Sequence, residues 1–154
     1  MRRLFLVLVL VVTAVLATAF TVATHTRNTL PIRFDPGGGI ITYIEKYEFV
    51  ARSGGSLKID GACISACTLF TGLVDPENVC ITSRAFLGFH SASFETPMGA
   101  AYSEDGTQLI WNIYPKVIRE WLQTKGWKGD EHPSLIFMDN DELSKLYKPC
   151  TGNT

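Results

Sequence analysis

Three residues, Ser65, His90 and Asp139, have the types and local settings that nucleophilic catalysis requires. Ser65 follows an apolar-alternating run and opens a short apolar segment, so its hydroxyl would lie near the free N–H groups of a helix start. A serine nucleophile needs a base within hydrogen-bond reach, a group that orients this base, and N–H donors for an oxyanion. These residue types therefore predict acyl-transfer chemistry, such as the hydrolysis of an amide or an ester.

Each of these residues also has a simpler interpretation. Serine is the preferred N-cap of helices, so Ser65 alone would more often be a cap than a nucleophile. His90 ends an apolar run, but it could be a core histidine whose ring bonds the backbone. The other histidines are weaker candidates, because His25 lies in a polar segment and His132 in a Gly-Asp-Glu-His-Pro loop. Asp139 stands out among the acids because it ends an apolar run, whereas most others lie in polar loops.

A glycine-rich turn lies upstream of the serine. Residues 31–34 alternate and predict a short strand, residues 35–39 (Asp-Pro-Gly-Gly-Gly) predict a turn, and apolar residues at helical spacing over 40–50 predict a helix. The N–H groups of such a turn can converge on an anion, although a plain connecting turn is the commoner case. The turn is not a phosphate loop, because no Gly-Lys-Ser/Thr follows it.

The rest of the chain alternates between strand and helix patterns. Such alternation predicts an α/β layer fold with a short, largely parallel sheet. A proline at position 115 should break the long amphipathic helix into two, or kink it. The predicted elements are strands at 56–60, 79–81, 85–89 and 135–138, helices at 65–72, 107–125 and 141–147, and a loop or flap at 91–106.

The N-terminus resembles an export segment. Met1-Arg-Arg precedes a nearly unbroken apolar run from Leu4 to Val22, as in a signal peptide, and the run is also long enough for an uncleaved membrane anchor. Both interpretations place the remaining chain beyond the inner membrane, in the periplasm or otherwise outside the cytoplasm. We therefore divide the chain into a signal peptide or anchor at 1–23, a linker at 24–30 and one domain at 31–154.

Charge and composition exclude some classes of partner and ligand. Without Arg2 and Arg3, the 14 basic residues fall to 12 against 15 acidic residues, a net charge of −3. No basic patch is evident, so we expect no nucleic-acid partner. Nothing in the sequence requires a metal or another cofactor, and we expect none.

Four cysteines in an exported chain predict two disulfides. A metal or redox pair at Cys63 and Cys67 is a weaker interpretation, because no histidine lies at ligand spacing. Three pairings are possible. We favour Cys67 with Cys80 and Cys63 with Cys150, since Cys67 should point off its helix towards the next strand while Cys63 faces the other way.

The order of these features resembles the proteolytic subunit of Clp protease, within the wider Clp/crotonase fold. The resemblance spans residues 31–147 and rests on the Pro-Gly-Gly turn opening a helix, a serine among small residues, and a histidine and an aspartate in the order Ser, His, Asp. The segments 79–90 and 137–144 are similar to the family's approaches to its histidine and aspartate. Small exported bacterial proteins of this fold with Cys-x-Ser-Ala-Cys-Thr and Gly-Phe-His are more similar still.

The resemblance implies a serine hydrolase, most simply a peptidase with a peptide or protein substrate. Ser65 would be the nucleophile, His90 the general base and Asp139 the group that orients it. Some relatives form homo-oligomers, which this chain could also do, and residues 4–23 could tether it to a membrane.

The resemblance also assigns the oxyanion donors, which would be the backbone N–H groups of Ala66 and Gly38, with Gly37 as the nearby alternative. Ala66 lies in the first turn after the serine, where N–H groups are free, and glycine lets the backbone approach an acyl group closely. The reaction would then proceed through an acyl-enzyme.

Two other functions and one other mechanism for the hydrolase remain open. The chain could be a catalytically silent scaffold or binding module of the same fold. A crotonase-type acyl-coenzyme A enzyme fits poorly, because coenzyme A is not expected outside the inner membrane. A Ser–Lys dyad would need Lys46 or Lys58 near the serine hydroxyl.

Overall fold

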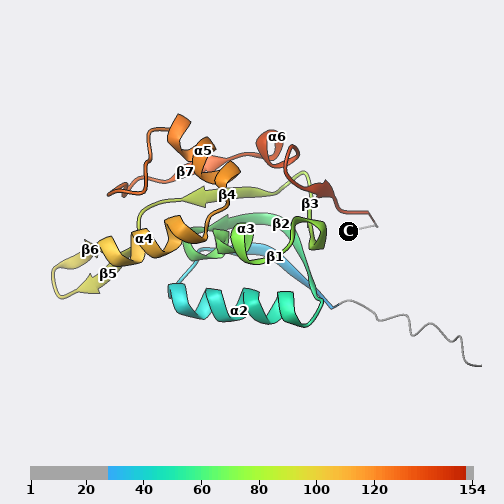
Figure 1. The fold of residues 1–154 in the computed structure, drawn as a ribbon, viewed down its shortest axis with the longest axis horizontal. Helices are drawn as coiled ribbons and strands as arrows, with labels where there is room; N and C mark the ends of the chain where they lie inside the picture. Colours follow the sequence, from blue (N-terminus) through green and yellow to red (C-terminus); the bar gives the residue numbers. More distant parts are fainter. Residues whose placement is uncertain (1–27, 152–154) are drawn as a thin grey trace, which may run out of the picture.

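The structure is a computed structural model that describes residues 28–151. Within these residues, a curled and mostly parallel sheet carries helices on one side, and a separate two-stranded hairpin extends from it (Figure 1). The mixed α/β class predicted from the sequence is therefore confirmed. The main sheet consists of β1 (Thr29–Asp35), β2 (Ser56–Ile64), β3 (Val79–Ile81), β4 (Phe86–Phe89), β7 (Ile136–Met138) and β8 (Lys148–Pro149).

Strand β2 is the centre of the sheet and determines where the site lies. Along one side β2 pairs in parallel with β1. Along its other side it pairs in parallel first with β3 and then with β4. β8 continues the sheet beyond β3, whereas β7 lies antiparallel beside β4. Because β1, β2 and β4 are parallel, the segments that follow them emerge at the same edge of the sheet.

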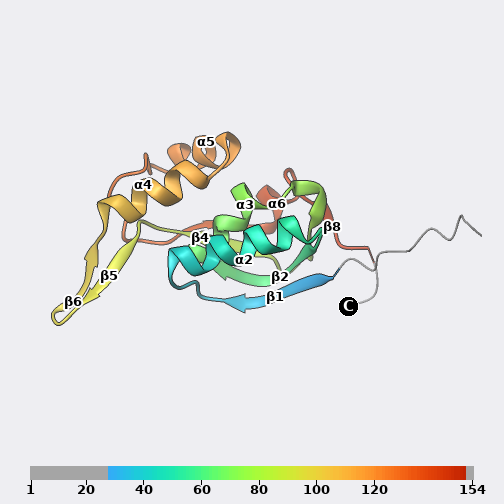
Figure 2. The same ribbon diagram turned by 60° about the horizontal axis from the view of Figure 1, so that its bottom comes forward.

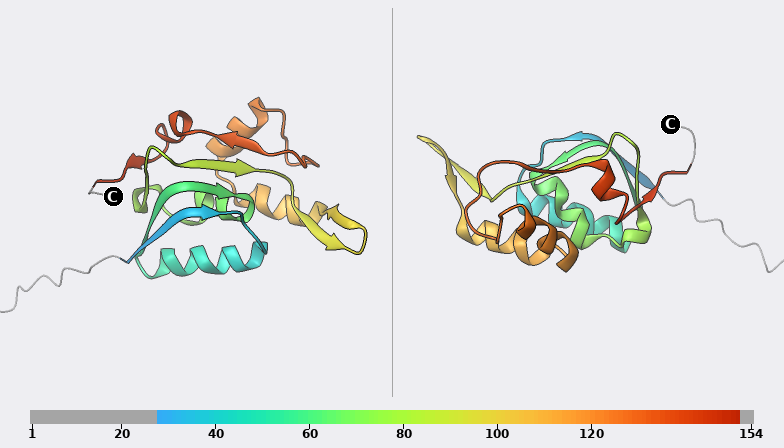
Figure 3. Two further views of the ribbon diagram at one scale, coloured as in Figure 1. Left: turned by 180° about the vertical axis from the view of Figure 1, so that it is seen from behind. Right: turned by 90° about the horizontal axis from the view of Figure 1, so that it is seen from above.

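The helices cover one face of the sheet. Figures 2 and 3 show α2, α3, α4 and α5 on one side of β1 and β2. Leu57, Ile59 and Cys63 alternate along β2, face this side and are fully buried. The helical elements are α2 (Ile40–Arg52), η1 (Ser65–Leu69), α3 (Phe70–Leu73), η2 (Pro76–Asn78), α4 (Glu104–Ile113), α5 (Lys116–Thr124) and α6 (Asn140–Leu143).

The segment between β4 and β7 differs in part from the prediction. The expected break at Pro115 is present, since α4 ends before it and α5 begins after it. The predicted loop at 91–106 instead contains an antiparallel hairpin of β5 (Ser93–Thr96) and β6 (Gly99–Tyr102), which extends away from the main sheet in Figure 1. Helix α4 starts earlier than predicted because the Ser103 side chain accepts a hydrogen bond from the Gly106 N–H at 3.1 Å.

Two disulfides form, as predicted, but our preferred pairing is wrong. The bonds join Cys63 to Cys67 and Cys80 to Cys150. The tight turn after β2 brings the Cα atoms of Cys63 and Cys67 within 5.3 Å on the helix side of the sheet. Cys80 pairs in register with Lys58, whose side chain points to the opposite side, so Cys80 cannot reach Cys67 and bonds to the chain that follows β8.

The predicted signal peptide or anchor at 1–23 lies outside the described residues, as does most of the predicted linker. The last linker positions belong to β1, which begins at Thr29 rather than after residue 30. Across residues 28–151, none of the helices combines the length and hydrophobicity needed to cross a bilayer.

Candidate active site

Ser65 occupies a strained turn at the end of the central strand. Its φ is 58°, and it is the only residue other than glycine with a positive φ among residues 28–151. A side chain in this region of φ/ψ costs free energy, and residues held there cluster at functional sites. A serine on a sharp strand-to-helix turn presents its hydroxyl above the sheet edge, as a nucleophile requires.

The turn is held in place from three directions. The Cys63–Cys67 disulfide spans it. The Thr68 hydroxyl donates to the Ser65 carbonyl at 2.7 Å and lies 2.7 Å from the Tyr114 hydroxyl. The hydroxyl of the fully buried Tyr47 donates to the Cys67 carbonyl at 2.8 Å. These contacts fix the strained backbone without using the Ser65 side chain.

The glycine-rich turn after β1 lies directly against Ser65. Asp35 pairs in register with Cys63, so the chain that leaves β1 passes beside the serine turn. A Cβ atom at Gly37 would lie 2.6 Å from the Ser65 Cβ and 2.9 Å from the Ala66 nitrogen. Only glycine permits this approach, which supports the prediction that the glycine-rich turn and the serine turn form one site.

Gly37 and Gly38 have different places in this turn. The Gly37 N–H already donates to the Asp35 carboxylate at 3.0 Å. Gly38 is the next N–H along the turn, and no hydrogen bond from it forms within the described part of the chain. The N–H of Ala66, in the first turn of η1, needs no partner within that helix. Gly38 and Ala66 thus each offer an N–H in the two turns that meet at the serine.

Asp35 anchors the glycine-rich turn, and sequence reasoning missed this role. Its carboxylate accepts hydrogen bonds from the Gly37 N–H, from the Tyr43 hydroxyl and from the Lys46 ammonium at 3.2 Å. Partial burial alone would raise the pKa of Asp35, but these donors outweigh it and lower the pKa below its ordinary value. The ionised carboxylate therefore holds the turn at neutral pH.

Replacing Asp35 should give a stability loss that depends on pH. Since the folded-state pKa lies below the unfolded value of about 3.9, the carboxylate stabilises the fold above that pH, and this contribution is lost as the pH falls through the folded pKa. We expect Asp35→Asn to lower the free energy of unfolding at pH 6 and to have a smaller effect at pH 3. Denaturant unfolding at both pH values measures this, and an equal loss at both would contradict it.

His90 lies at the same edge of the sheet as Ser65. Ile64 pairs with Gly88 in the parallel β2–β4 ladder, so Ser65 follows directly after this pair and His90 follows two residues after it. The His90 side chain is half-buried, and its Nδ1 lies 2.7 Å from the Ser91 carbonyl. A carbonyl only accepts hydrogen bonds, so Nδ1 carries a proton, and in the neutral ring the lone pair is then on Nε2. This is the tautomer that a general base needs.

Ser91 holds the acceptor that orients His90. The residue is buried, and its N–H donates to the His132 carbonyl at 2.9 Å. The Ala92 N–H, which shares a peptide unit with the Ser91 carbonyl, donates to the Thr107 hydroxyl at 2.9 Å and so fixes this acceptor. A backbone acceptor has no signature in the sequence, which is why this group could not be predicted. His90 and Ser91 also line a hollow of ≈ 240 Å³ between the hairpin and the 131–133 loop.

Asp139 does not lie beside His90. Strand β7 runs antiparallel to β4, with Met138 opposite Leu87, so Asp139 follows at the level of Phe86. Phe86 precedes His90 by four residues, so Asp139 and His90 are separated by about 13 Å along the strand direction. The Asp139 carboxylate is exposed and accepts from the Glu142 N–H at 3.0 Å as the N-cap of α6. The structure thus gives Asp139 a capping role instead of the predicted role of orienting the base.

Neither lysine of the possible Ser–Lys dyad is placed to activate Ser65, because Lys46 is paired with a carboxylate and Lys58 is far from the serine. Lys46 forms an ion pair with Asp35 at 3.2 Å. Lys58 lies seven residues before Ser65 in the extended strand β2, about 23 Å away along the strand. Among the predicted residues, the structure therefore brings Ser65, Ala66, Gly37 and Gly38 together, with His90 at the same edge of the sheet.

The four cysteines predicted as disulfide partners have a further relation to this site. One bond encloses the serine turn, and the other closes the sheet edge at β3 and β8. Both bonds are compatible with a location outside the cytoplasm.

In comparisons with known proteins, no family model, no curated protein and no solved structure matches this chain.

Proposed function

We propose that this protein is a serine hydrolase that cleaves an amide or ester bond, most simply a peptidase outside the cytoplasm. The strained turn at Ser65, braced against the glycine-rich turn, is the single observation that carries the proposal. A side chain held at a positive φ costs free energy, and a serine that only capped a helix would have an extended backbone instead. The resemblance to the Clp/crotonase fold supports the same conclusion.

The chemistry follows from the roles of these groups. The Ser65 Oγ attacks the carbonyl carbon of the substrate while His90 Nε2 removes the hydroxyl proton. The N–H groups of Ala66 and Gly38 donate to the oxygen that becomes negative. His90 then gives its proton to the leaving group, and the substrate acyl group remains on Ser65. Water attacks this ester, with His90 again as the base, and releases the acid product.

The Ser91 carbonyl takes the place of the usual carboxylate in this mechanism. It holds the His90 ring and its tautomer through Nδ1–H, as an orienting acid would. A neutral carbonyl stabilises the imidazolium less than a carboxylate does, so we expect slower turnover than with a complete triad. We also propose a peptide substrate and a homo-oligomer. Both proposals rest on the resemblance to the Clp protease family.

Hydrolysis of an activated ester tests the proposal. We expect the purified protein to hydrolyse p-nitrophenyl acetate with an initial burst of nitrophenol, because the acyl-enzyme accumulates. Ser65→Ala should abolish the burst, and His90→Ala should reduce its rate by about 10²–10⁴. Ser91→Ala is the matched control, since it retains the backbone carbonyl and should keep the burst. A burst that survives Ser65→Ala would contradict the proposal.

Asp139 provides a prediction that separates this mechanism from a Ser-His-Asp triad. Asp139→Ala should lower the free energy of unfolding by about 1 kcal/mol, because α6 loses its N-cap. The burst rate should stay unchanged, because the carboxylate lies at the far end of β4 from His90. Denaturant unfolding and the ester assay measure the two effects. A rate loss of about 10⁴, as for a triad carboxylate, would contradict this assignment.

A silent scaffold is the second candidate function. The observation that favours it is the neutral acceptor at His90, since a carbonyl is a weaker partner for a working base than a carboxylate. This candidate predicts no burst and no difference between the parent chain and Ser65→Ala. The ester assay therefore decides between the two candidates.

A further inference from the structure

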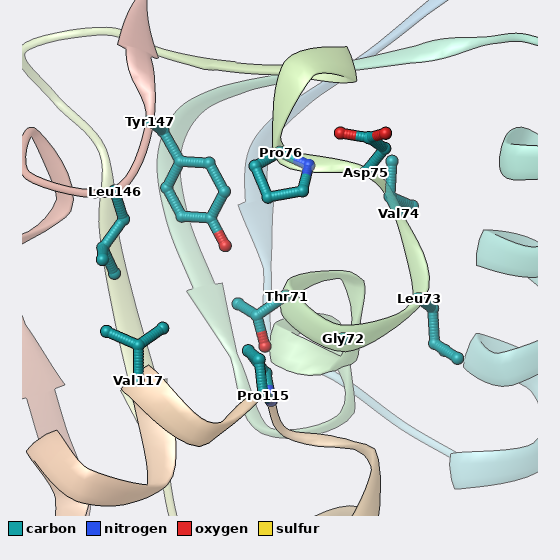
Figure 4. A pocket seen from close by; sticks show the side chains of 10 residues that line it. All are labelled: Thr71, Gly72, Leu73, Val74, Asp75, Pro76, Pro115, Val117, Leu146 and Tyr147. Carbon is teal, nitrogen blue, oxygen red and sulfur yellow. The ribbon is translucent and has the colours of Figure 1, made fainter.

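A second cleft lies away from the serine site, and neither Ser65 nor His90 lines it. It has a volume of ≈ 490 Å³, within the range of sites for small molecules. Figure 4 shows it between α3, the residues that start α5 and the segment after α6. Its apolar walls are formed by Leu73, Val74, Pro76, Pro115, Val117 and Leu146.

Thr71 places an unpartnered hydroxyl in the wall of this cleft. The residue is 4% exposed, and its Oγ1 has no hydrogen-bond partner among the described residues. A helical threonine often donates to the carbonyl four residues earlier, but here that carbonyl, of Cys67, accepts from Tyr47 instead. Pro115, which lines the same cleft, has no N–H to donate to this hydroxyl. A buried hydroxyl without a partner is costly and needs an explanation.

Tyr147 places a second hydroxyl on the opposite wall. Its ring packs against Phe70, with centroids 5.7 Å apart, and Figure 4 shows the hydroxyl pointing into the cleft towards Thr71. No hydrogen bond to this hydroxyl forms within residues 28–151. Burial raises the pKa of Tyr147, so the group stays protonated and can donate at neutral pH.

We propose that this cleft binds a small, uncharged, mostly apolar molecule through one carbonyl-type oxygen. Tyr147 donates one hydrogen bond to that oxygen. Thr71 donates the other after a rotation about χ1 that moves its hydroxyl to the position now held by its methyl group. The apolar walls exclude a strongly hydrated ligand. Asp75 at the rim disfavours an anion, and no basic side chain lines the cleft to offset it.

Acetophenone and cumene form a matched pair of probes, because they share a benzene ring and a branched substituent but only acetophenone has a carbonyl. We expect acetophenone to shift the methyl NMR signals of Val117 and Leu146 in the full chain in a saturable way. Thr71→Val and Tyr147→Phe should each weaken acetophenone binding about fivefold, the net value of one hydrogen bond. Cumene binding should not weaken in either variant. Absence of saturable shifts, or acetophenone binding equal in all three proteins, would overturn the proposal.

Thr71→Val also reports on the protein without ligand. Valine has the shape of threonine, so we expect the variant to fold and to melt at a higher temperature, because it removes an unpaired buried hydroxyl. A lower melting temperature would show that Thr71 has a partner in the free protein, and the proposal would fail.

Two other occupants would also overturn the proposal. A second copy of the chain would give a dimer in sedimentation that Val117→Glu disrupts, since Val117 is 49% exposed at the rim. The N-terminal residues 1–27 would block the cleft in the full chain, and acetophenone would then bind only after their removal. A monomer that binds acetophenone as a full chain supports the small-molecule site.

Discussion

Gly37→Ala should reduce the ester burst by at least about 10², the effect of losing one oxyanion donor. The new Cβ would lie 2.6 Å from both the Ser65 Cβ and the Ile64 carbonyl oxygen, so the glycine-rich turn must move away from the serine. The φ of 87° adds strain of about 1–3 kcal/mol for any residue with a Cβ. Burst kinetics and denaturant unfolding measure the two effects.

Gly38→Ala is the matched control for this prediction. A Cβ at Gly38 would meet only the Tyr43 ring, at 3.4 Å, and the variant keeps the N–H that we assign to the oxyanion. We expect it to keep most of its activity and stability. Equal losses in the two variants would show that the turn as a whole tolerates no side chain, and would contradict the distinction between Gly37 and Gly38.

Loss of the long disulfide should cost more stability, whereas loss of the short disulfide should cost more activity. Removing Cys80–Cys150, whose cysteines are 70 residues apart, should cost about 4 kcal/mol of unfolding free energy in the chain-entropy model. Removing Cys63–Cys67, with a separation of four, should cost only about 2 kcal/mol. The short bond, however, spans the strained serine turn, so its loss should lower the burst rate far more than loss of the long bond does.

Paired substitutions to alanine test this prediction. Cys63→Ala with Cys67→Ala removes the bond at the site, and Cys80→Ala with Cys150→Ala removes the distant one. Each double variant is compared with the parent chain in unfolding and in the ester assay, at a temperature where both remain folded. A distant-bond variant that loses more activity than the site variant would show that the short disulfide does not hold the serine turn.

Local patterns in the sequence were sufficient to predict most of the elements around the site. The alternation of β1, the glycines after it and the helical spacing of α2 are encoded within about 25 residues, and these elements form as expected. Pro115 likewise acts on its own backbone and breaks the helix. Ser65 and His90 were identified because each follows an apolar run, and runs in parallel strands end at one edge of a sheet.

Features that depend on pairing between distant segments could not be predicted in this way. The direction of β7 determines where Asp139 lies, and the four-residue apolar run at 135–138 carries no signal for direction. The partner of Cys80 depends on the pairing of β8 with β3, and β8 has only two residues, too few to show a strand pattern in the sequence. The Ser91 carbonyl and the Asp35 anchor depend on where the backbone turns after each strand, and neither follows from residue type.

We infer that the Ser65 hydroxyl is a nucleophile activated by His90. Intact-mass and peptide mass spectrometry after treatment with a fluorophosphonate, under oxidising conditions, tests it most directly. We expect one phosphonyl adduct per chain, located on Ser65, with a labelling rate that falls by at least about 10² in His90→Ala. A chain that gains no mass, an adduct on another residue, or labelling of Ser65 at the same rate without His90 would contradict it.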